Sequence, residues 1–257
     1  MSSVLFPLDT GRRPAGPPAT HALVAVPHAG GTAHGFRSWT APAGARELRM
    51  FGVRTAMPAA DAQDWTVRAR ARKLAEALAE LRDPYVLLGH SLGGIISAEA
   101  VRHLEQHIPQ AVPSLLVVCA TSPPHLRRPV PAPNGTEAEA VDFLRTAGGT
   151  PQEVLDDPRM RELAVAMLLT DLASLRDFAW GGRRIATPTA VYAGRTDRTV
   201  APETLSQWTG SAESVTTRVF DSGHFFPHDL TDDVLDAVRL DLADARAPGR
   251  TPTTLRP

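Results

Sequence analysis

The sequence has one cysteine, one lysine and no long apolar run. The single cysteine, Cys119, excludes an internal disulfide, and its place in the apolar stretch "LLVVCA" predicts a small buried side chain rather than a catalytic thiol. No apolar stretch reaches the roughly 18 residues that a membrane-spanning helix needs. The first residues lack the basic start and apolar core of a secretory signal, so we expect a cytoplasmic protein.

Net charge is also small. Of 27 basic residues only Lys73 is a lysine. The formal net charge of −1 gives no indication of a nucleic-acid partner, which would favour a basic surface. The 257 residues, 43% of them hydrophobic, suffice for one sizeable core. We therefore predict a single domain over residues 1–257, with 247–257 as a flexible tail because that segment shows no periodicity. A monomer is one state that the sequence allows.

Short apolar runs alternate with helical patterns along the chain. The runs lie at 21–26, 47–53, 85–88, 115–120, 188–193 and 215–220, and the helical patterns at 64–81, 92–107 and 232–245. Nearly continuous apolar strands separated by helices predict a mostly parallel sheet with helices on both faces. The expected fold class is therefore α/β.

Residues 121–185 interrupt this alternation. Thr136 to Glu139 and Thr150 to Glu153 have the spacing of capping boxes, and Asp157-Pro158 has the composition of a third helix start. Three helices inserted after a sheet strand predict a lid above the carboxyl ends of the strands, where α/β sites lie. A helical insertion without a gating role is the alternative.

The motif Gly-x-Ser-x-Gly stands in "LLGHSLGGII", between a predicted strand and a predicted helix. This is the setting of a nucleophile elbow, which projects the serine hydroxyl above the sheet at the start of a helix. We therefore predict Ser91 as a nucleophile and the backbone N–H of Leu92 as one donor to an oxyanion. A glycine-rich turn with a capping serine is the alternative.

A serine nucleophile needs a base and an acid, which follow it in this fold. His224 lies in a loop after the last predicted strand, and Asp197 lies after the strand before it. Asp221 is the competing acid, although a local turn explains it better. His103 and His107 are spaced like metal ligands, but no third ligand accompanies them, so we predict a surface pair and no metal.

Five motifs in order along the chain resemble the type II thioesterases of nonribosomal peptide and polyketide synthesis. They are "PHAGG" at 27–31, "GHSLGG" at 89–94, "GGTPQEVLDDPRMRELAVAMLLTDL" in the insertion, "GRTD" at 194–197 and "GHFF" at 223–226. The resemblance spans about 23–242 and implies the α/β-hydrolase fold. Two details depart from the family pattern: Leu92-Gly93-Gly94 where relatives often have Met-Gly-Ala, and Arg198 in place of a proline.

This resemblance implies a Ser91–His224–Asp197 triad and an oxyanion site formed by the Ala29 and Leu92 amides. It also implies hydrolysis of stalled or misprimed acyl groups from the phosphopantetheine arm of acyl or peptidyl carrier proteins, with no cofactor of the enzyme's own. A carboxylesterase or lipase on the same fold is one alternative, and a non-catalytic scaffold protein is another. A terminal cyclising domain is less favoured, because no carrier region is fused to the chain.

Two groups of residues are candidates for substrate and partner contacts. We expect apolar side chains of the third lid helix to line an acyl channel, although packing of the lid on the core explains them equally well; they are Met160, Leu163, Met167 and Leu168. Paired arginines flank the insertion and are candidates for docking an acidic carrier protein, with solvated surface charge as the alternative; they are Arg127, Arg128, Arg183 and Arg184.

Overall fold

Seven strands form one sheet in the computed structural model, which describes residues 4–9, 19–54, 65–126, 136–147, 149–176 and 178–246. The strands are β1 (Leu5–Pro7), β2 (His21–Val26), β3 (Leu48–Val53), β4 (Tyr85–His90), β5 (Leu115–Cys119), β6 (Thr189–Gly194) and β7 (Val215–Phe220). Their order is β1-β3-β2-β4-β5-β6-β7, and every neighbouring pair is parallel except β1 with β3. The predicted mostly parallel sheet is confirmed.

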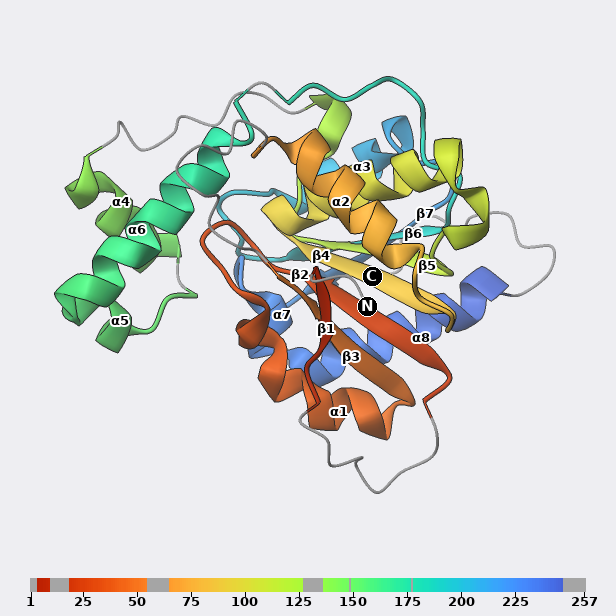
Figure 1. Cartoon of the computed structure of the whole chain (residues 1–257), viewed down its shortest axis with the longest axis horizontal. Helices are drawn as coiled ribbons and strands as arrows, with labels where there is room; N and C mark the ends of the chain where they lie inside the picture. Colours follow the sequence, from red (N-terminus) through yellow and green to blue (C-terminus); the bar gives the residue numbers. More distant parts are fainter. Residues whose placement is uncertain are drawn as a thin grey trace.

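Helices cover both faces of this sheet (Figure 1). One face packs on α2 (Val67–Leu78) and α3 (Leu92–His107), and the other on α1 (Thr40–Ala45), α7 (Phe226–Asp229) and α8 (Thr231–Arg246). Alternate residues of each central strand enter the two cores, which is why these strands are apolar throughout. The predicted α/β class is confirmed.

Sequence patterns missed one strand and misplaced one helix start. β1 is three residues long and pairs only with β3 at the sheet edge, so no alternation marks it. α2 begins at Val67 rather than at residue 64, because Thr66 caps it by accepting a hydrogen bond from the Ala69 N–H (3.2 Å).

Three helices occupy the insertion and project beside the carboxyl end of the sheet (Figure 1). They are α4 (Glu137–Ala147), α5 (Gln152–Asp156) and α6 (Pro158–Ala173), and we call them the lid. The lid has a small core of its own, made of Ala140, Leu144, Leu155, Val165 and Leu168. Its gating role stays a prediction.

Two of the three predicted helix starts in the lid are confirmed. Thr136 and Glu139 form the capping box, and Asp157 caps α6 by accepting from the N–H groups of Arg159 and Met160. The box predicted at Thr150 is wrong, because Pro151 is the N-cap of α5 and no side chain bonds there. Residues 247–257, predicted as a flexible tail, lie outside the described residues. Within the described ranges, no helix has the length and apolarity to cross a membrane.

Candidate active site

Ser91 lies at a strained turn between β4 and α3. Its φ of 55° and ψ of −116° are values that a residue with a side chain rarely adopts. The segment around β5 holds the turn, because the Ser91 N–H donates to Cys119 O (2.8 Å) and the Thr121 hydroxyl proton is shared between Cys119 O (2.9 Å) and Ser91 O (3.1 Å). The hydroxyl of Ser91 therefore stands at the first turn of α3, where the helix dipole favours developing negative charge.

Gly94 explains a departure from the family pattern. A Cβ at this position would overlap the Thr121 hydroxyl, which is engaged with Ser91 O and with Cys119 O (2.9 Å). The alanine of the family pattern would therefore fit here only if the Thr121 side chain shifted. Thr121 was not singled out from the sequence, because only the fold brings it beside the elbow.

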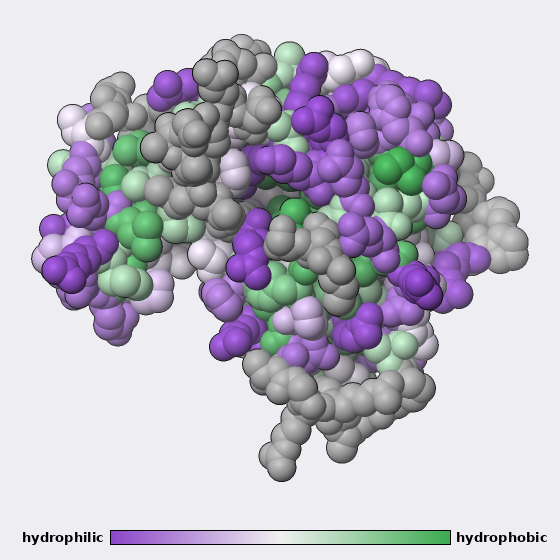
Figure 2. All heavy atoms as spheres, in the orientation of Figure 1, coloured by the Kyte–Doolittle hydropathy of each residue, from purple (hydrophilic) through white to green (hydrophobic). Residues whose placement is uncertain are grey.

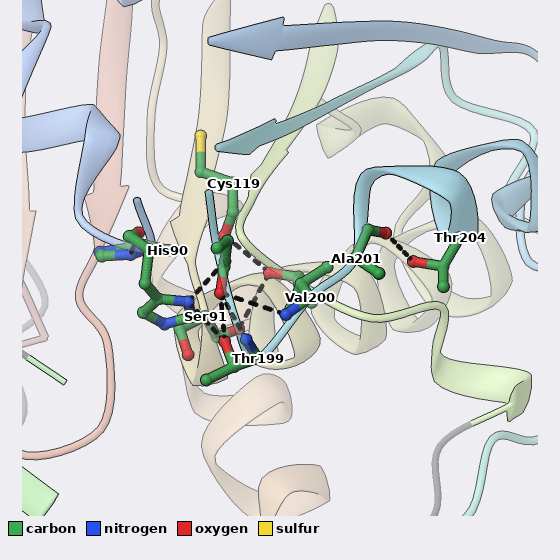
Figure 3. A network of polar contacts seen from close by, with 10 residues as sticks. His90, Ser91, Cys119, Thr199, Val200, Ala201 and Thr204 are labelled. Atoms are coloured by element: carbon green, nitrogen blue, oxygen red, sulfur yellow. Dashed lines mark hydrogen bonds and ion pairs between the residues drawn. The ribbon is translucent and has the colours of Figure 1, made fainter. Parts of the chain in front are cut away.

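Asp197 and His224 lie on the loops after β6 and β7 and contact each other. The His224 Nδ1–H donates to Asp197 Oδ2 (2.8 Å), which leaves Nε2 for a reacting group. Asp197 Oδ1 accepts from the Thr199 N–H (2.7 Å) and the Val200 N–H (3.2 Å), so the carboxylate is fixed in a turn. Figure 3 shows the Thr199–Val200 segment beside Ser91.

Thr199 is a member of this network that the sequence reading missed. Its hydroxyl donates to Asp197 Oδ1 (2.7 Å), and its oxygen lies 2.8 Å from His224 Nδ1. Burial would raise the pKa of Asp197, but the hydrogen bonds and charge of His224 and the bonds from Thr199 outweigh it, so that pKa is lowered. Asp197 is therefore held as a carboxylate. The Asp-x-Thr spacing was the available signal for Thr199.

The competing acid, Asp221, is not near the imidazole. Its side chain is exposed and pairs with Arg195 on the surface (3.4 Å). Of the two carboxylates considered, the structure brings only Asp197 to His224.

A cavity of about 440 Å³ joins Ser91 and His224. Its lining is His28, Ala29, Ser91, Leu92, Ile95, Ala120, Thr121, Ser122, Leu126, Phe143, Leu144, Thr150, Leu172, Leu175, Thr199, Val200, His224 and Phe225. No Asp, Glu, Lys or Arg is among these described residues, so the cavity suits an uncharged, largely apolar group. Within the described chain no hydrogen bond joins Ser91 Oγ to His224, and such contacts are often long before substrate binds.

The Ala29 and Leu92 amides border the same cavity. The Gly31 N–H donates to His28 O (3.0 Å), which closes a four-residue turn over 28–31, and Gly30 has the φ of 73° that the third residue of a type II turn needs. Among the described residues, neither the Ala29 nor the Leu92 N–H donates to another backbone group. Both are thus available to an oxyanion.

Comparison with known proteins agrees with this geometry. The sequence model of the thioesterase domain matches residues 21–241. The chain belongs to the thioesterase domain family. AMB antimetabolite synthetase AmbE of Pseudomonas aeruginosa is 31% identical over 239 residues, which are 91% of this chain and 11% of AmbE. The chain thus spans about a tenth of that synthetase.

Two further relatives resemble the chain over most of their length. Gramicidin S biosynthesis protein GrsT of Aneurinibacillus migulanus is 23% identical over 250 residues, which cover 88% of this chain and 90% of GrsT. The solved structure of the type II thioesterase BorB from the borrelidin biosynthetic cluster has a TM-score of 0.77 at 25% identity, and covers 93% of this chain and 97% of that one.

Three histidines, the buried His90 and the half-buried His28 and His228, form a junction beside the thioesterase site. His28, His90 and His228 present ring nitrogens that lie within 4.8 Å of one another, and among the described residues they are the group with the ligand types of a metal site. The His90 Nε2–H donates to His224 O (3.0 Å), and Phe225 packs edge-on against His28 and His90. The junction therefore ties together the loops that carry Ala29, Ser91 and His224. The absence of a metal stays a prediction.

These three histidines are held neutral. Burial lowers the pKa of His28 to about 3, with a smaller contribution from the charges of His228 and His224. Burial also lowers the pKa of His90 and of His228. His228, on α7, packs against His28 and Phe36 and does not line the cavity.

The four predicted acyl-channel residues of α6 lie outside the lining of this cavity, and their role in a channel stays a prediction. None of Met160, Leu163, Met167 and Leu168 lines the cavity. Met160 and Leu163 are exposed (48% and 46%), on a lid whose surface carries apolar side chains in Figure 2, and Leu168 is buried in the lid core. The inward stripe of α6 and the turn after it is Val165, Leu168, Leu172 and Leu175, of which the last two reach the cavity. α6 carries apolar residues on two faces, so helical spacing alone grouped the inward Leu168 with the exposed Met160 and Leu163.

Two of the four predicted docking arginines, Arg183 and Arg184, are not brought to the cavity. Arg183 and Arg184 are exposed but precede Ala186, whose N–H donates to Glu105 near the end of α3 (3.0 Å). Helix geometry puts that end about 20 Å from Ser91. Arg127 and Arg128 lie outside the described residues. A docking role stays a prediction for all four.

Proposed function

We propose that the protein is a serine thioesterase that hydrolyses acyl groups from the phosphopantetheine arm of acyl or peptidyl carrier proteins. The observation that supports it best is the shared cavity, where the strained Ser91 and the Asp197-bound His224 face one apolar space. The groups removed are stalled or misprimed acyl chains in polyketide or nonribosomal peptide synthesis. The protein acts in the cytoplasm and uses no cofactor of its own.

In the first half of the cycle, His224 Nε2 takes the Ser91 hydroxyl proton as Oγ attacks the thioester carbonyl carbon. The carbonyl oxygen becomes an oxyanion that accepts from the Ala29 and Leu92 N–H groups. Removal of one such donor typically costs about 10²–10³ in rate. The C–S bond then breaks, His224 returns the proton to the departing thiol, and Ser91 is left acylated.

In the second half, water replaces the thiol. His224 Nε2 takes a proton from water as its oxygen attacks the acyl carbon. The tetrahedral intermediate collapses, the Ser91 Oγ–acyl bond breaks, and His224 gives the proton back to Oγ. Throughout, Asp197 keeps the imidazole in the tautomer whose Nε2 can accept a proton.

Carrier proteins are proposed as partners on the basis of the relatives. BorB is described as a type II thioesterase of a biosynthetic cluster, and GrsT as a gramicidin S biosynthesis protein. The uncharged lining of the cavity fits an acyl group without a free carboxylate. Because AmbE contains its matching region within a far longer synthetase, a releasing domain of such a synthetase is the second candidate.

Mass spectrometry of carrier proteins loaded with a panel of acyl groups tests the proposal. We expect the wild-type protein to return carriers to the free thiol form, and Ser91→Ala to lose more than about 10³ of this rate. Oxygen esters of the same acids serve as the comparison. Faster cleavage of the oxygen esters would favour a carboxylesterase. Residual hydrolysis by the Ser91→Ala variant at the wild-type rate would disprove the nucleophile, and an inert wild type that resists a fluorophosphonate label would indicate a scaffold protein.

A further inference from the structure

One buried carboxylate of the lid reaches the turn that carries the Ala29 amide. Asp171, on the last turn of α6, accepts a hydrogen bond from the Gly30 N–H through Oδ2 (2.8 Å). Its Oδ1 accepts from the Arg70 guanidinium of α2 (2.8 Å). Both side chains are largely buried (6% and 9% exposed), so the pair is weakly screened by solvent.

Gly30 connects this carboxylate to Ala29, which lines the cavity. The Ala29–Gly30 peptide is the central peptide of the 28–31 turn, and its N–H is the group that Asp171 holds. If this peptide flipped, the Ala29 carbonyl would face the Asp171 carboxylate, which repels it. Asp171 thereby holds Gly30 in this turn conformation. The Ala29 N–H belongs to the adjacent His28–Ala29 peptide, so Asp171 positions it indirectly, by fixing the turn on which Ala29 lies. The α6 backbone at Leu168 also packs against Gly30, where an added Cβ would lie 3.4 Å away.

Arg70 is itself held in place, and it therefore fixes the Asp171 carboxylate that it binds. Its guanidinium lies over the Trp65 ring, 4.6 Å from the centroid. Next to Asp171 on α6, Leu172 lines the cavity and packs against the lid core. The same helix turn therefore contacts the acyl group on one side and the oxyanion turn on the other.

We propose that Asp171 is a positioning residue for the oxyanion site, which it couples to the lid through Gly30. The inference rests on the proposed function. A displacement of about 1 Å in a reacting geometry can cost about 10²-fold in rate, so a small relaxation of the turn is enough to be measured.

The test compares Asp171→Asn and Asp171→Ala with the wild type on acetyl-pantetheine, a thioester whose short acyl group makes little use of the lid. We expect kcat to fall about 10- to 100-fold for Asp171→Ala and less for Asp171→Asn, which keeps an acceptor for the Gly30 N–H, with KM changed less than about twofold. The inhibition constant of an alkyl boronic acid, which bonds to Ser91 and places an oxygen in the oxyanion site, should rise by the same factor as kcat falls.

Glu137→Gln is the matched control, because it removes an ion pair between Glu137 and Arg161 within the lid that does not reach Gly30. It should leave kcat and boronate affinity unchanged. Thermal unfolding checks that each variant is folded. If folded Asp171 variants keep wild-type kcat and boronate affinity, or if only KM rises, the inference is wrong and the pair only anchors the lid. If the wild type cleaves no thioester, the proposed function fails, while the boronate comparison still tests Asp171.

Discussion

The floor and the roof of the active-site cavity are held in different ways. The floor is the set of loops that carry Ser91, Asp197 and His224, and each is fixed by hydrogen bonds to its neighbours, such as Ser91 N–H to Cys119 O and His90 Nε2–H to His224 O. The roof is the lid, which packs on five buried residues of its own. Asp171 is the buried link that we identify between the two.

This difference suits two tasks: the floor carries out the reaction, and the roof determines which acyl groups are accepted. The floor must keep reacting groups in place to within a fraction of an ångström, and dense buried hydrogen bonding does so. The roof contacts the acyl group and reaches the floor through Asp171 and Leu168 at Gly30, and its small separate core lets the rest of its lining change without disturbing the floor. We therefore expect floor substitutions to reduce kcat strongly and roof substitutions to change the preference for acyl length.

The largest effect should come from the floor. Asp197→Asn leaves the size of the side chain unchanged but no longer favours the His224 tautomer with a free Nε2, so kcat should fall by about 10⁴. Steady-state hydrolysis of one acyl-carrier thioester measures this. Asp221→Asn is the matched control, since it alters an exposed carboxylate three residues before His224 and should change kcat less than about twofold. Equal losses in both variants would contradict the assignment of the acid.

An intermediate effect should appear in acid, where the histidine junction opposes protonation. The folded pKa of His28 is about 3 against 6.5 for the free side chain, so below pH 6.5 the unfolded chain binds a proton that the folded chain does not. Stability from this group is fully present above pH 6.5 and is lost toward pH 3, at about 1.4 kcal/mol for each pH unit.

Urea unfolding at pH 7.5 and pH 5.0 measures this loss. His28→Asn should lose about 2 kcal/mol less than the wild type over that interval. His34→Asn, which removes an exposed histidine, should follow the wild type. The same pH dependence in all three proteins would mean that the junction does not control acid stability.

The smallest effect should come from the roof. Phe143 lines the cavity from α4, so Phe143→Ala should raise KM for a long acyl thioester about three- to tenfold and leave acetyl hydrolysis unchanged. Met160→Ala removes another exposed apolar lid side chain, which lies outside the cavity, and should change neither value. KM measured across a series of acyl lengths gives the comparison. A uniform loss at all lengths in Phe143→Ala would show that roof and floor are not separable.

The sequence predicted the floor better than the roof for a physical reason. Strands buried on both faces have continuous apolar runs, and the residues after them must meet at one sheet edge, so Ser91, Asp197 and His224 could be placed together. The lid helix α6 has apolar residues on two faces, and only packing shows that Leu172 faces the cavity while Met160 does not.

Contacts between distant segments could not be predicted. Arg70 and Asp171 are separated by 101 positions in the chain, and the histidine junction joins His28 to His228. Neither spacing has a local pattern, because both depend on how loops approach after the sheet has formed. Thr199 is different, since it lies two residues after Asp197 and its turn pattern was visible.

The close approach of Gly94 and Thr121 also restricts how this enzyme can evolve. An alanine at 94 would force the Thr121 side chain to shift, and its hydroxyl contacts the backbone of the nucleophile. A change at 94 toward the alanine of the family pattern would therefore loosen or redirect the contact between Thr121 and Ser91 O. The effect of a substitution at either position depends on the residue at the other, which makes this pair a site of epistasis directly behind Ser91.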